Sequence, residues 1–233
     1  MKILCVLYDD PKGGMPKSYP LSDLPKLEKY PDGMTLPSPK GRDFTPGQLL
    51  GCVPTFLLIM QIFLDTADYN EIADRYVTGL ISGITTNPTL VRKSGVSYYD
   101  FIGTLSKDFA FESISAEVDG QTAAEMIDNA QRYIDIGPEV TIKLPLTREG
   151  LIACKDLSGK GIKTNVTLCF SAAQAALAGL AGATYISPFV GRMNDNSCSG
   201  VELVRAISGL YCTQQIGTKV LAASLRDVHH VSR

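Results

Sequence analysis

A lysine stands inside a short run that otherwise reads as a buried strand. In EVTIKLPLT, residues 139–147, apolar residues alternate with Thr141 and Lys143. Because successive strand side chains point to opposite faces, Lys143 lies on the face opposite the apolar set. Stripping water from an ammonium group costs several kcal/mol, so lysine is seldom buried without a partner. Either Lys143 reaches solvent past the strand end, or its buried position serves chemistry.

Polar side chains also stand where other short apolar runs end. In a (β/α)8 barrel the catalytic groups lie at the C-terminal ends of the strands. Each residue has a structural alternative: a strand-end Asp can cap a helix, TTNP can form a turn, and an arginine can be a surface charge. Together they would place a lysine, two carboxylates and two arginines around one barrel mouth, which structural needs alone do not explain. The candidates are Asp65, Asn87, Glu117, Lys143, Asn165, Thr167, Ser187, Arg192, Ser224 and Arg226.

The chemistry that suits this set is Schiff-base catalysis. An amine attacks a ketone only when it is deprotonated, and we expect burial in an apolar barrel to lower the pKa of Lys143. The resulting iminium draws electrons from a neighbouring carbon–carbon bond, and a nearby carboxylate moves the protons. Arginines at the mouth would hold a phosphate group by fork-like hydrogen bonds.

Strand-like runs alternate with helical patterns from Gln61 onward. Examples of the helical patterns are residues 122–134, 171–181 and 199–211. This alternation indicates βα units around a parallel sheet and predicts an α/β fold of the TIM (β/α)8-barrel type, incomplete because seven strands are recognisable. The predicted strands are Ile62–Asp65, Leu80–Thr86, Ile114–Val118, Val140–Leu144, Ile162–Leu168, Thr184–Pro188 and Lys219–Ser224.

The N-terminal part has a different composition. Prolines and glycines crowd residues 9–47, which excludes long helices and central strands there. We therefore expect two regions: residues 1–55, mostly irregular after one short strand at Lys2–Tyr8, and the barrel at residues 60–233. The uncharged stretch Leu49–Leu64 is too short for a membrane span and is interpreted as a linker that runs into a buried strand.

Charge and cysteine content limit the classes of partner. The 233-residue chain has a formal net charge of −2 and no basic run, which argues against binding to nucleic acid or a membrane surface. Its six cysteines show no CxxC or metal-type spacing, so reduced thiols in a cytoplasmic protein are expected. Partners are then small molecules or further copies of the chain.

Six ordered segments resemble signature segments of the transaldolase family. They are LDTA, GITTNP, EVTIKLP, NVTLCFSAAQA, ISPFVGRMND and VLAASLR, and they extend from about residue 60 to the C-terminus. The resemblance implies that Lys143 forms the Schiff base and that Asp65 transfers the proton at the cleaved bond. It also implies that Glu117 and Thr167 hold a catalytic water. The implied substrate contacts are Asn87, Asn165, Ser187 and Phe189, with Arg192, Ser224 and Arg226 at the phosphate.

The implied reaction moves a dihydroxyacetone unit between sugar phosphates, from sedoheptulose 7-phosphate or fructose 6-phosphate to an aldose phosphate, without a metal or organic cofactor. Such a reaction belongs to the pentose phosphate pathway. The sister group, fructose-6-phosphate aldolase, typically has glutamine at the position of Glu117 and tyrosine at that of Phe189. The sequence favours transaldolase, with the aldolase or a non-catalytic, truncated fusion product as alternatives. Members of the family of this short type often form rings of five or ten subunits, so a homo-oligomer is one possible state implied by the resemblance.

Two segments depart from the family pattern. Residues 1–53 resemble the opening of bacterial NAD-dependent formate dehydrogenases, so the chain is interpreted as a fusion or a mis-joined gene. No GxGxxG follows a strand, and we expect no NAD binding and solvent-facing roles for His229 and His230. A fragment that binds a dehydrogenase partner through this segment is a further alternative.

The second departure is at the C-terminus, where the family would continue through a helix, an eighth strand and a closing helix after AASLRDVHHVSR. We therefore expect an open barrel with two unpaired edges. The segment Lys2–Tyr8 is the one spare strand, and we do not expect it to fill the gap.

Overall fold

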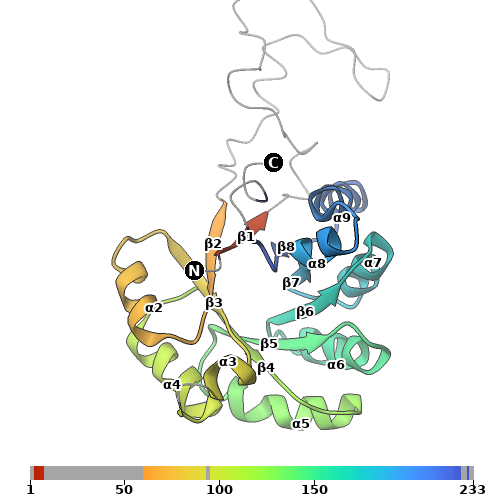
Figure 1. Cartoon of the computed structure of the whole chain (residues 1–233). Coiled ribbons are helices and arrows are strands. Elements are labelled where there is room, and N and C mark those ends of the chain that lie inside the picture. Colours follow the sequence, from red (N-terminus) through yellow and green to blue (C-terminus); the bar gives the residue numbers. More distant parts are fainter. Residues whose placement is uncertain (1–2, 8–59, 93–94, 227–229, 231–233) are drawn as a thin grey trace, which may run out of the picture.

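Eight strands form a closed barrel in the computed structural model (Figure 1). The structure describes residues 3–7, 60–92, 95–226 and 230. Neighbouring strands from β2 to β8 run parallel, so their C-terminal ends share one rim. The predicted α/β barrel with seven parallel strands is confirmed. The strands are β1 (Ile3–Leu7), β2 (Gln61–Asp65), β3 (Ile81–Thr85), β4 (Ser113–Glu117), β5 (Val140–Pro145), β6 (Thr164–Cys169), β7 (Tyr185–Pro188) and β8 (Lys219–Ala222).

The slot between β8 and β2 is filled by β1, which runs antiparallel to both neighbours. Cys5 of β1 pairs with Ile62 on one side and with Ala222 on the other. We expected that Lys2–Tyr8 would not fill the gap and that the barrel would stay open, and both expectations are wrong. Open strand edges carry unpaired backbone N–H and C=O groups, and pairing on both sides satisfies them. The rest of the predicted irregular segment, residues 8–55, lies outside the described residues.

Helices lie outside the barrel and connect most of the strands (Figure 1). The predicted helical patterns correspond to α5, α7 and α9, each of which begins one residue later because Thr122, Ser171 and Ser199 are N-caps whose side chains accept backbone N–H bonds. The helices are α2 (Tyr69–Tyr76), α3 (Pro88–Arg92), α4 (Tyr98–Asp108), α5 (Ala123–Ile134), α6 (Arg148–Gly159), α7 (Ala172–Leu180), α8 (Val190–Asp195) and α9 (Gly200–Gln214).

Alternation along each strand separates an outer face, packed on helices, from an inner face that fills the barrel. On β5, Ile142 and Leu144 are fully buried in the main core, and Lys143 between them faces inward. One layer below the rim, the interior is filled by Phe63, Tyr185 and Leu221. The rings of Phe63 and Tyr185 meet edge to face with centroids 5.7 Å apart. This layer supports the polar residues above it.

Polar residues close the opposite end of the barrel. Glu112 accepts hydrogen bonds from Gln61 Nε2 and from Lys219 Nζ, the latter at 2.9 Å. Lys219 also donates to Gln61 Oε1 at 3.3 Å, which links the two strands that flank β1. The barrel therefore has side-chain contacts across the slot in addition to the pairing of β1.

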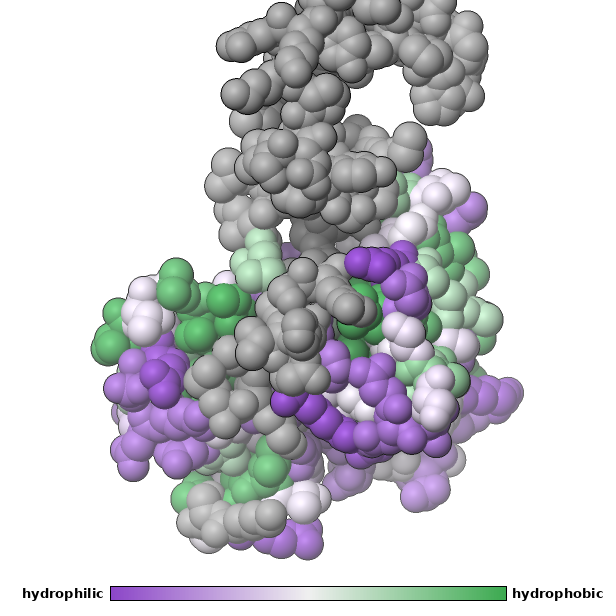
Figure 2. Space-filling view, turned by 45° about the horizontal axis from the view of Figure 1, so that its top comes forward, coloured by the Kyte–Doolittle hydropathy of each residue, from purple (hydrophilic) through white to green (hydrophobic). Residues whose placement is uncertain are grey.

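Hydrophilic and apolar side chains are intermixed over the face seen in Figure 2. Within the described parts of the chain, no helix is long and apolar enough to cross a membrane. Of the uncharged stretch Leu49–Leu64, residues 49–59 lie outside the described part, and its last residues form β2, as expected of a linker entering a strand.

Candidate active site

A cavity of about 180 Å³ lies at the rim formed by the C-terminal strand ends. A larger groove of about 760 Å³, beside α2 and α4, contains none of the predicted site residues. We place the site in the smaller cavity because the lysine and the polar strand ends converge there. Its lining includes every predicted site residue except Glu117 and Arg226, together with Thr85 and Ala223: Asp65, Asn87, Lys143, Asn165, Thr167, Ser187, Phe189, Arg192 and Ser224.

Lys143 projects into the barrel with a side chain that is 13% exposed. Its Nζ atom lies 2.8 Å from Oε2 of Glu117 and 3.5 Å from the carbonyl oxygen of Thr86. A carboxylate partner explains how a lysine is accommodated at this depth. The amine of Lys143 is therefore ion-paired at this depth in the barrel.

Asp65 is oriented by the neighbouring strand. Thr85 Oγ1 donates a hydrogen bond to Asp65 Oδ1 at 3.1 Å, and Thr85 is itself buried. Asn87 also lines the cavity, but its Oδ1 accepts a bond from Leu90 N at 3.0 Å. Asn87 therefore has a local structural role at the start of the helix that follows, alongside its position in the cavity.

Asn165 and Ser187 belong to a buried hydrogen-bond network that crosses the barrel. Ser187 Oγ donates to Asn165 Oδ1 at 2.8 Å, and Asn165 Nδ2 donates to Ser115 Oγ at 3.2 Å. All three residues are buried, so removing one partner would leave a polar group without compensation. The network fixes the orientation of the two cavity-lining side chains.

Two buried hydroxyl groups at the rim have no hydrogen-bond partner among the described residues, those of Thr86 and Thr167. Buried polar groups in folded proteins almost always have a partner, so an orphan at a cavity wall points to a ligand or a water molecule. Thr167 is 6% exposed and lines the cavity. In the described part of the chain, no group of three or more His, Cys, Asp or Glu side chains could hold a metal ion.

Arg192 lies over the ring of Phe189, with its guanidinium carbon 4.9 Å from the ring centroid. The edge of the Phe189 ring in turn meets Phe170, with centroids 5.7 Å apart. The cation–π contact and the packing of the two rings restrict the rotamers of Arg192 and so fix the orientation of its guanidinium group. Arg192 is thereby held at the cavity wall.

Arg226 lies beyond the cavity wall and is engaged by Asp195 at the end of α8. The contact is bidentate: Nη2 donates to Oδ2 at 2.7 Å, and Nη1 donates to Oδ1. Hydrogen bonding to Arg226, followed by the charges of Arg226 and Arg192, holds the pKa of the Asp195 carboxyl below its usual value. Ser224, two residues before Arg226, has a φ of 59°. Its non-glycine, left-handed backbone indicates strain at this strand end.

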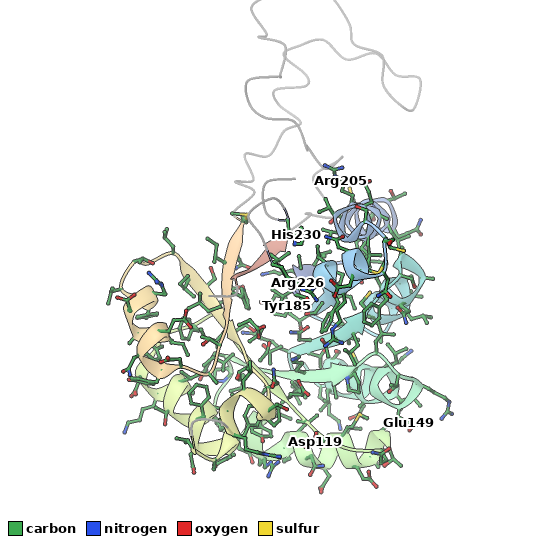
Figure 3. All side chains as sticks on the ribbon, viewed as in Figure 1. Asp119, Glu149, Tyr185, Arg205, Arg226 and His230 are labelled. Carbon is green, nitrogen blue, oxygen red and sulfur yellow. The ribbon has the colours of Figure 1, made fainter. Side chains whose placement is uncertain are left out.

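His230 lies close to the same cluster (Figure 3). Its Nδ1 accepts a bond from Arg226 N at 3.3 Å, and its Nε2 lies 2.7 Å from Asn194 Nδ2. His230 is partly exposed, so the solvent-facing role predicted for it stays a prediction. His229 lies outside the described residues.

Sequence reasoning missed Thr85, Ser115 and Asp195. Thr85 and Ser115 each lie two residues before a predicted site residue, so strand alternation could have placed both on the inner face. Asp195 follows Arg192 by three residues, which brings the two to one side of a helix. The contact of Asp195 with Arg226, 31 residues away in sequence, has no local signal.

The comparisons with known proteins agree with the geometry. Residues 62–233 match the family model described as Transaldolase/Fructose-6-phosphate aldolase. A probable transaldolase of Caulobacter vibrioides (strain NA1000 / CB15N) is 51% identical over 172 residues, covering 74% of this chain and 79% of the relative. A probable transaldolase of Caulobacter sp. (strain K31) is 49% identical with the same coverage. Probable transaldolase 2 of Bacillus cereus is 48% identical over 180 residues, covering 75% of this chain and 81% of the relative.

The family match begins at residue 62, just inside β2. It gives no support to the resemblance between residues 1–53 and formate dehydrogenases, which stays a prediction. The matched part contains all the residues that line the cavity. By this match and by its identity to these relatives, the chain belongs to the transaldolase/fructose-6-phosphate aldolase family.

Proposed function

We propose that the chain is a transaldolase that moves a dihydroxyacetone unit between sugar phosphates through a Schiff base on Lys143. The observation that carries the proposal is the pairing of Lys143 with Glu117 at 2.8 Å, beside a cavity lined by polar strand ends. An amine with a carboxylate at hydrogen-bond distance can lose its proton locally and form a covalent bond to a ketone. The names of the relatives support the same reaction class, a transferase.

The covalent step begins with proton transfer from Lys143. Glu117, directly or through a water held with Thr167, accepts the proton, and the free amine attacks the ketone carbon. Glu117 then returns the proton to the hydroxyl of the resulting carbinolamine, which leaves as water, and an iminium bonded to Nζ forms. The orphan hydroxyl of Thr167 supports this role because a buried donor at the cavity wall can hold that water.

Cleavage then breaks the bond between the third and fourth carbons of the ketose. Asp65 takes the proton of the C4 hydroxyl, the electron pair of the broken bond moves toward the iminium, and an enamine stays on Lys143. The aldose phosphate leaves, and a second aldehyde accepts the enamine carbon while Asp65 returns the proton. The bond from Thr85 supports this assignment because a fixed carboxylate needs less reorganisation in the transition state.

Substrate binding is assigned to the remaining cavity residues. Asn87, Asn165 and Ser187 would contact hydroxyl groups of the sugar, and the buried network behind the last two supports this role. Arg192, Ser224 and Arg226 would hold the phosphate, with Phe189 beneath Arg192. We assign the reaction to the pentose phosphate pathway in the cytoplasm; in the described part of the chain Cys154, Cys169, Cys198 and Cys212 are free thiols, which is compatible with a reducing compartment. A homo-oligomer stays a prediction.

An acceptor-dependence assay tests the proposed function. The chain is incubated with fructose 6-phosphate, with and without erythrose 4-phosphate, and glyceraldehyde 3-phosphate is followed by a coupled reduction. A transaldolase releases it in quantity only when the acceptor is present. Release of free dihydroxyacetone at a comparable rate without acceptor would assign the chain to the aldolase side of the family instead.

A further inference from the structure

We propose that Asp195 is a positioning residue that acts through Arg226: its carboxylate occupies the guanidinium fork when the site is empty and weakens the hold on sugar phosphates. The inference rests on the proposed function, because it takes Arg226 as part of the phosphate subsite. Weaker phosphate binding would let aldose phosphates exchange more easily while the three-carbon unit stays bonded to Lys143.

The geometry of the pair carries the inference. Asp195 meets both terminal nitrogens of Arg226, with Nη2 to Oδ2 at 2.7 Å and a second bond from Nη1 to Oδ1. A phosphate would use the same two parallel N–H groups in a bidentate contact. Carboxylate and phosphate therefore compete for one fork.

The pair lies beside Arg192 and Ser224, the two residues of the proposed phosphate subsite that line the cavity. Gly191 on α8 donates its backbone N–H to the carbonyl oxygen of Ser224 at 3.1 Å. A Cβ atom at Gly191 would lie 2.3 Å from that oxygen and 2.7 Å from Arg226 Nε, so only glycine permits this approach. Contact between α8 and the end of β8 thus brings Asp195, Arg192, Ser224 and Arg226 into one cluster.

Exchange of the carboxylate for a phosphate is feasible because the pair is accessible. The side chains of Arg226 and Asp195 are 50% and 51% exposed. Ion pairs with this exposure contribute little, so their displacement reduces ligand affinity by about fivefold or less. A phosphate dianion carries more charge than a carboxylate and has more acceptor oxygens, so it can displace Asp195.

Competition between Asp195 and phosphate for Arg226 would help the exchange of aldose phosphates that the proposed reaction requires. After cleavage one aldose phosphate must leave and another must enter the same subsite, while the enamine stays on the lysine. A phosphate site without an internal competitor would hold both substrates and products more tightly, which lowers KM without raising kcat. A carboxylate that returns to Arg226 replaces the departing phosphate.

The alternative is that Asp195 only orients Arg226 toward the phosphate. That role predicts the opposite sign, because loss of the carboxylate would then weaken phosphate binding. The two roles are separated by measuring inorganic phosphate binding by isothermal titration calorimetry for the full chain, for Asp195→Asn and for Asp156→Asn. Asp156 on α6 pairs with Lys160 at the end of that helix, so this control removes a similarly exposed carboxylate away from the cavity.

Asp195→Asn is expected to bind inorganic phosphate about two- to fivefold more tightly, and Asp156→Asn to bind it like the unmodified chain. KM for fructose 6-phosphate should fall in parallel in Asp195→Asn while kcat does not rise. Asp195→Ala should shift phosphate affinity in the same direction, which guards against a folding defect in one variant. Unchanged or weaker phosphate binding in both Asp195 variants would overturn the inference.

A second readout separates this inference from the proposed function. Borohydride trapping of unphosphorylated dihydroxyacetone on Lys143 does not use the phosphate subsite, so it should proceed equally in the unmodified chain and in Asp195→Asn. Loss of trapping in Asp195→Asn alone would overturn the inference, since Asp195 would then act at the lysine. Failure of trapping in the unmodified chain would count against the proposed function and leave the phosphate measurement to decide the role of Asp195.

Discussion

At the scale of single residues, Lys143 and Glu117 act as a pair in the proposed chemistry. Their contact at 2.8 Å gives the lysine a proton acceptor and a counter-charge at once. Glu117→Gln retains the size of the side chain and removes both functions. We expect kcat to fall about 10²-fold or more, which is typical for loss of a general acid–base group.

The matched control for this variant is Glu202→Gln, which removes an exposed carboxylate paired with Arg205 on α9. It should leave the steady-state rate unchanged. A folded Glu117→Gln chain that retained full kcat would show that the contact is structural rather than catalytic.

Substitution of Thr85 tests whether its hydroxyl group orients the carboxylate of Asp65. Thr85→Val replaces the hydroxyl that donates to Asp65 with a methyl group of similar volume. Loss of one such hydrogen bond is worth about 1 kcal/mol or more, so we expect kcat to fall roughly tenfold with KM little changed. Thr104→Val, which removes a hydroxyl bonded to Asp100 O on α4, is the control. Equal kcat values for the two variants would contradict the assigned role.

The inner-facing residues of the site could be predicted from the sequence to a large extent, because strand alternation fixes which side chains reach the rim. Lys143, Asn165 and Ser187 follow this rule. The partners that hold them could not be predicted, because their contacts join distant segments. Ser115 meets Asn165 across 50 residues of sequence, and nothing local signals that bond.

At the scale of secondary-structure elements, the strands and helices follow from hydrophobic periodicity and capping residues, but local irregularities do not. Residues 162–168 were predicted as one strand, whereas β6 begins at Thr164 and ends at Cys169. Its pairing with β7 shifts between Thr167 and Cys169, and Leu168 there has a φ of 68°. A left-handed leucine leaves no sequence signal, because glycine is the residue that normally marks this conformation.

Substitution of two glycines by alanine should change the stability of the chain in opposite directions. A Cβ atom at Gly83 on β3 would meet Phe63 Cε1 at 2.4 Å and Ser113 O at 2.6 Å, so Gly83→Ala should destabilise the barrel by about 1–3 kcal/mol. A Cβ atom at Gly103 on α4 would meet no atom of the described residues within 4 Å, so Gly103→Ala should stabilise the chain by roughly 0.5–1 kcal/mol. Urea unfolding of the two variants measures both effects, and equal shifts of the same sign would contradict this account of the packing.

At the scale of the whole molecule, closure of the barrel depends on a strand from the other end of the chain. The segment at Lys2–Tyr8 was predicted as a strand, but not its partners or its direction. Its antiparallel pairing with both β2 and β8 depends on the slot between them, which exists only once the barrel has formed. This tertiary constraint is why the fold class could be predicted from the sequence and the closure could not.

The closing role of β1 is tested at Val6, which pairs with Gln61 on one side and with Leu221 on the other. Val6→Pro removes a backbone N–H and restricts φ in the middle of a paired strand, so it should cost about 3 kcal/mol of unfolding free energy and promote aggregation through open edges. Val6→Ile, which keeps the backbone donor, is the control. Identical denaturation midpoints for both variants would indicate that β1 does not contribute to closure.

The most direct test of the central claim is covalent trapping at the lysine. The full chain is incubated with fructose 6-phosphate, reduced with borohydride and mapped by mass spectrometry, with Lys143→Ala as the control. The proposed mechanism predicts a sugar-derived mass on the peptide that contains Lys143 and none in the variant. A folded chain without an adduct, or with an adduct that persists in Lys143→Ala, would contradict the assignment of Lys143 as the Schiff-base residue.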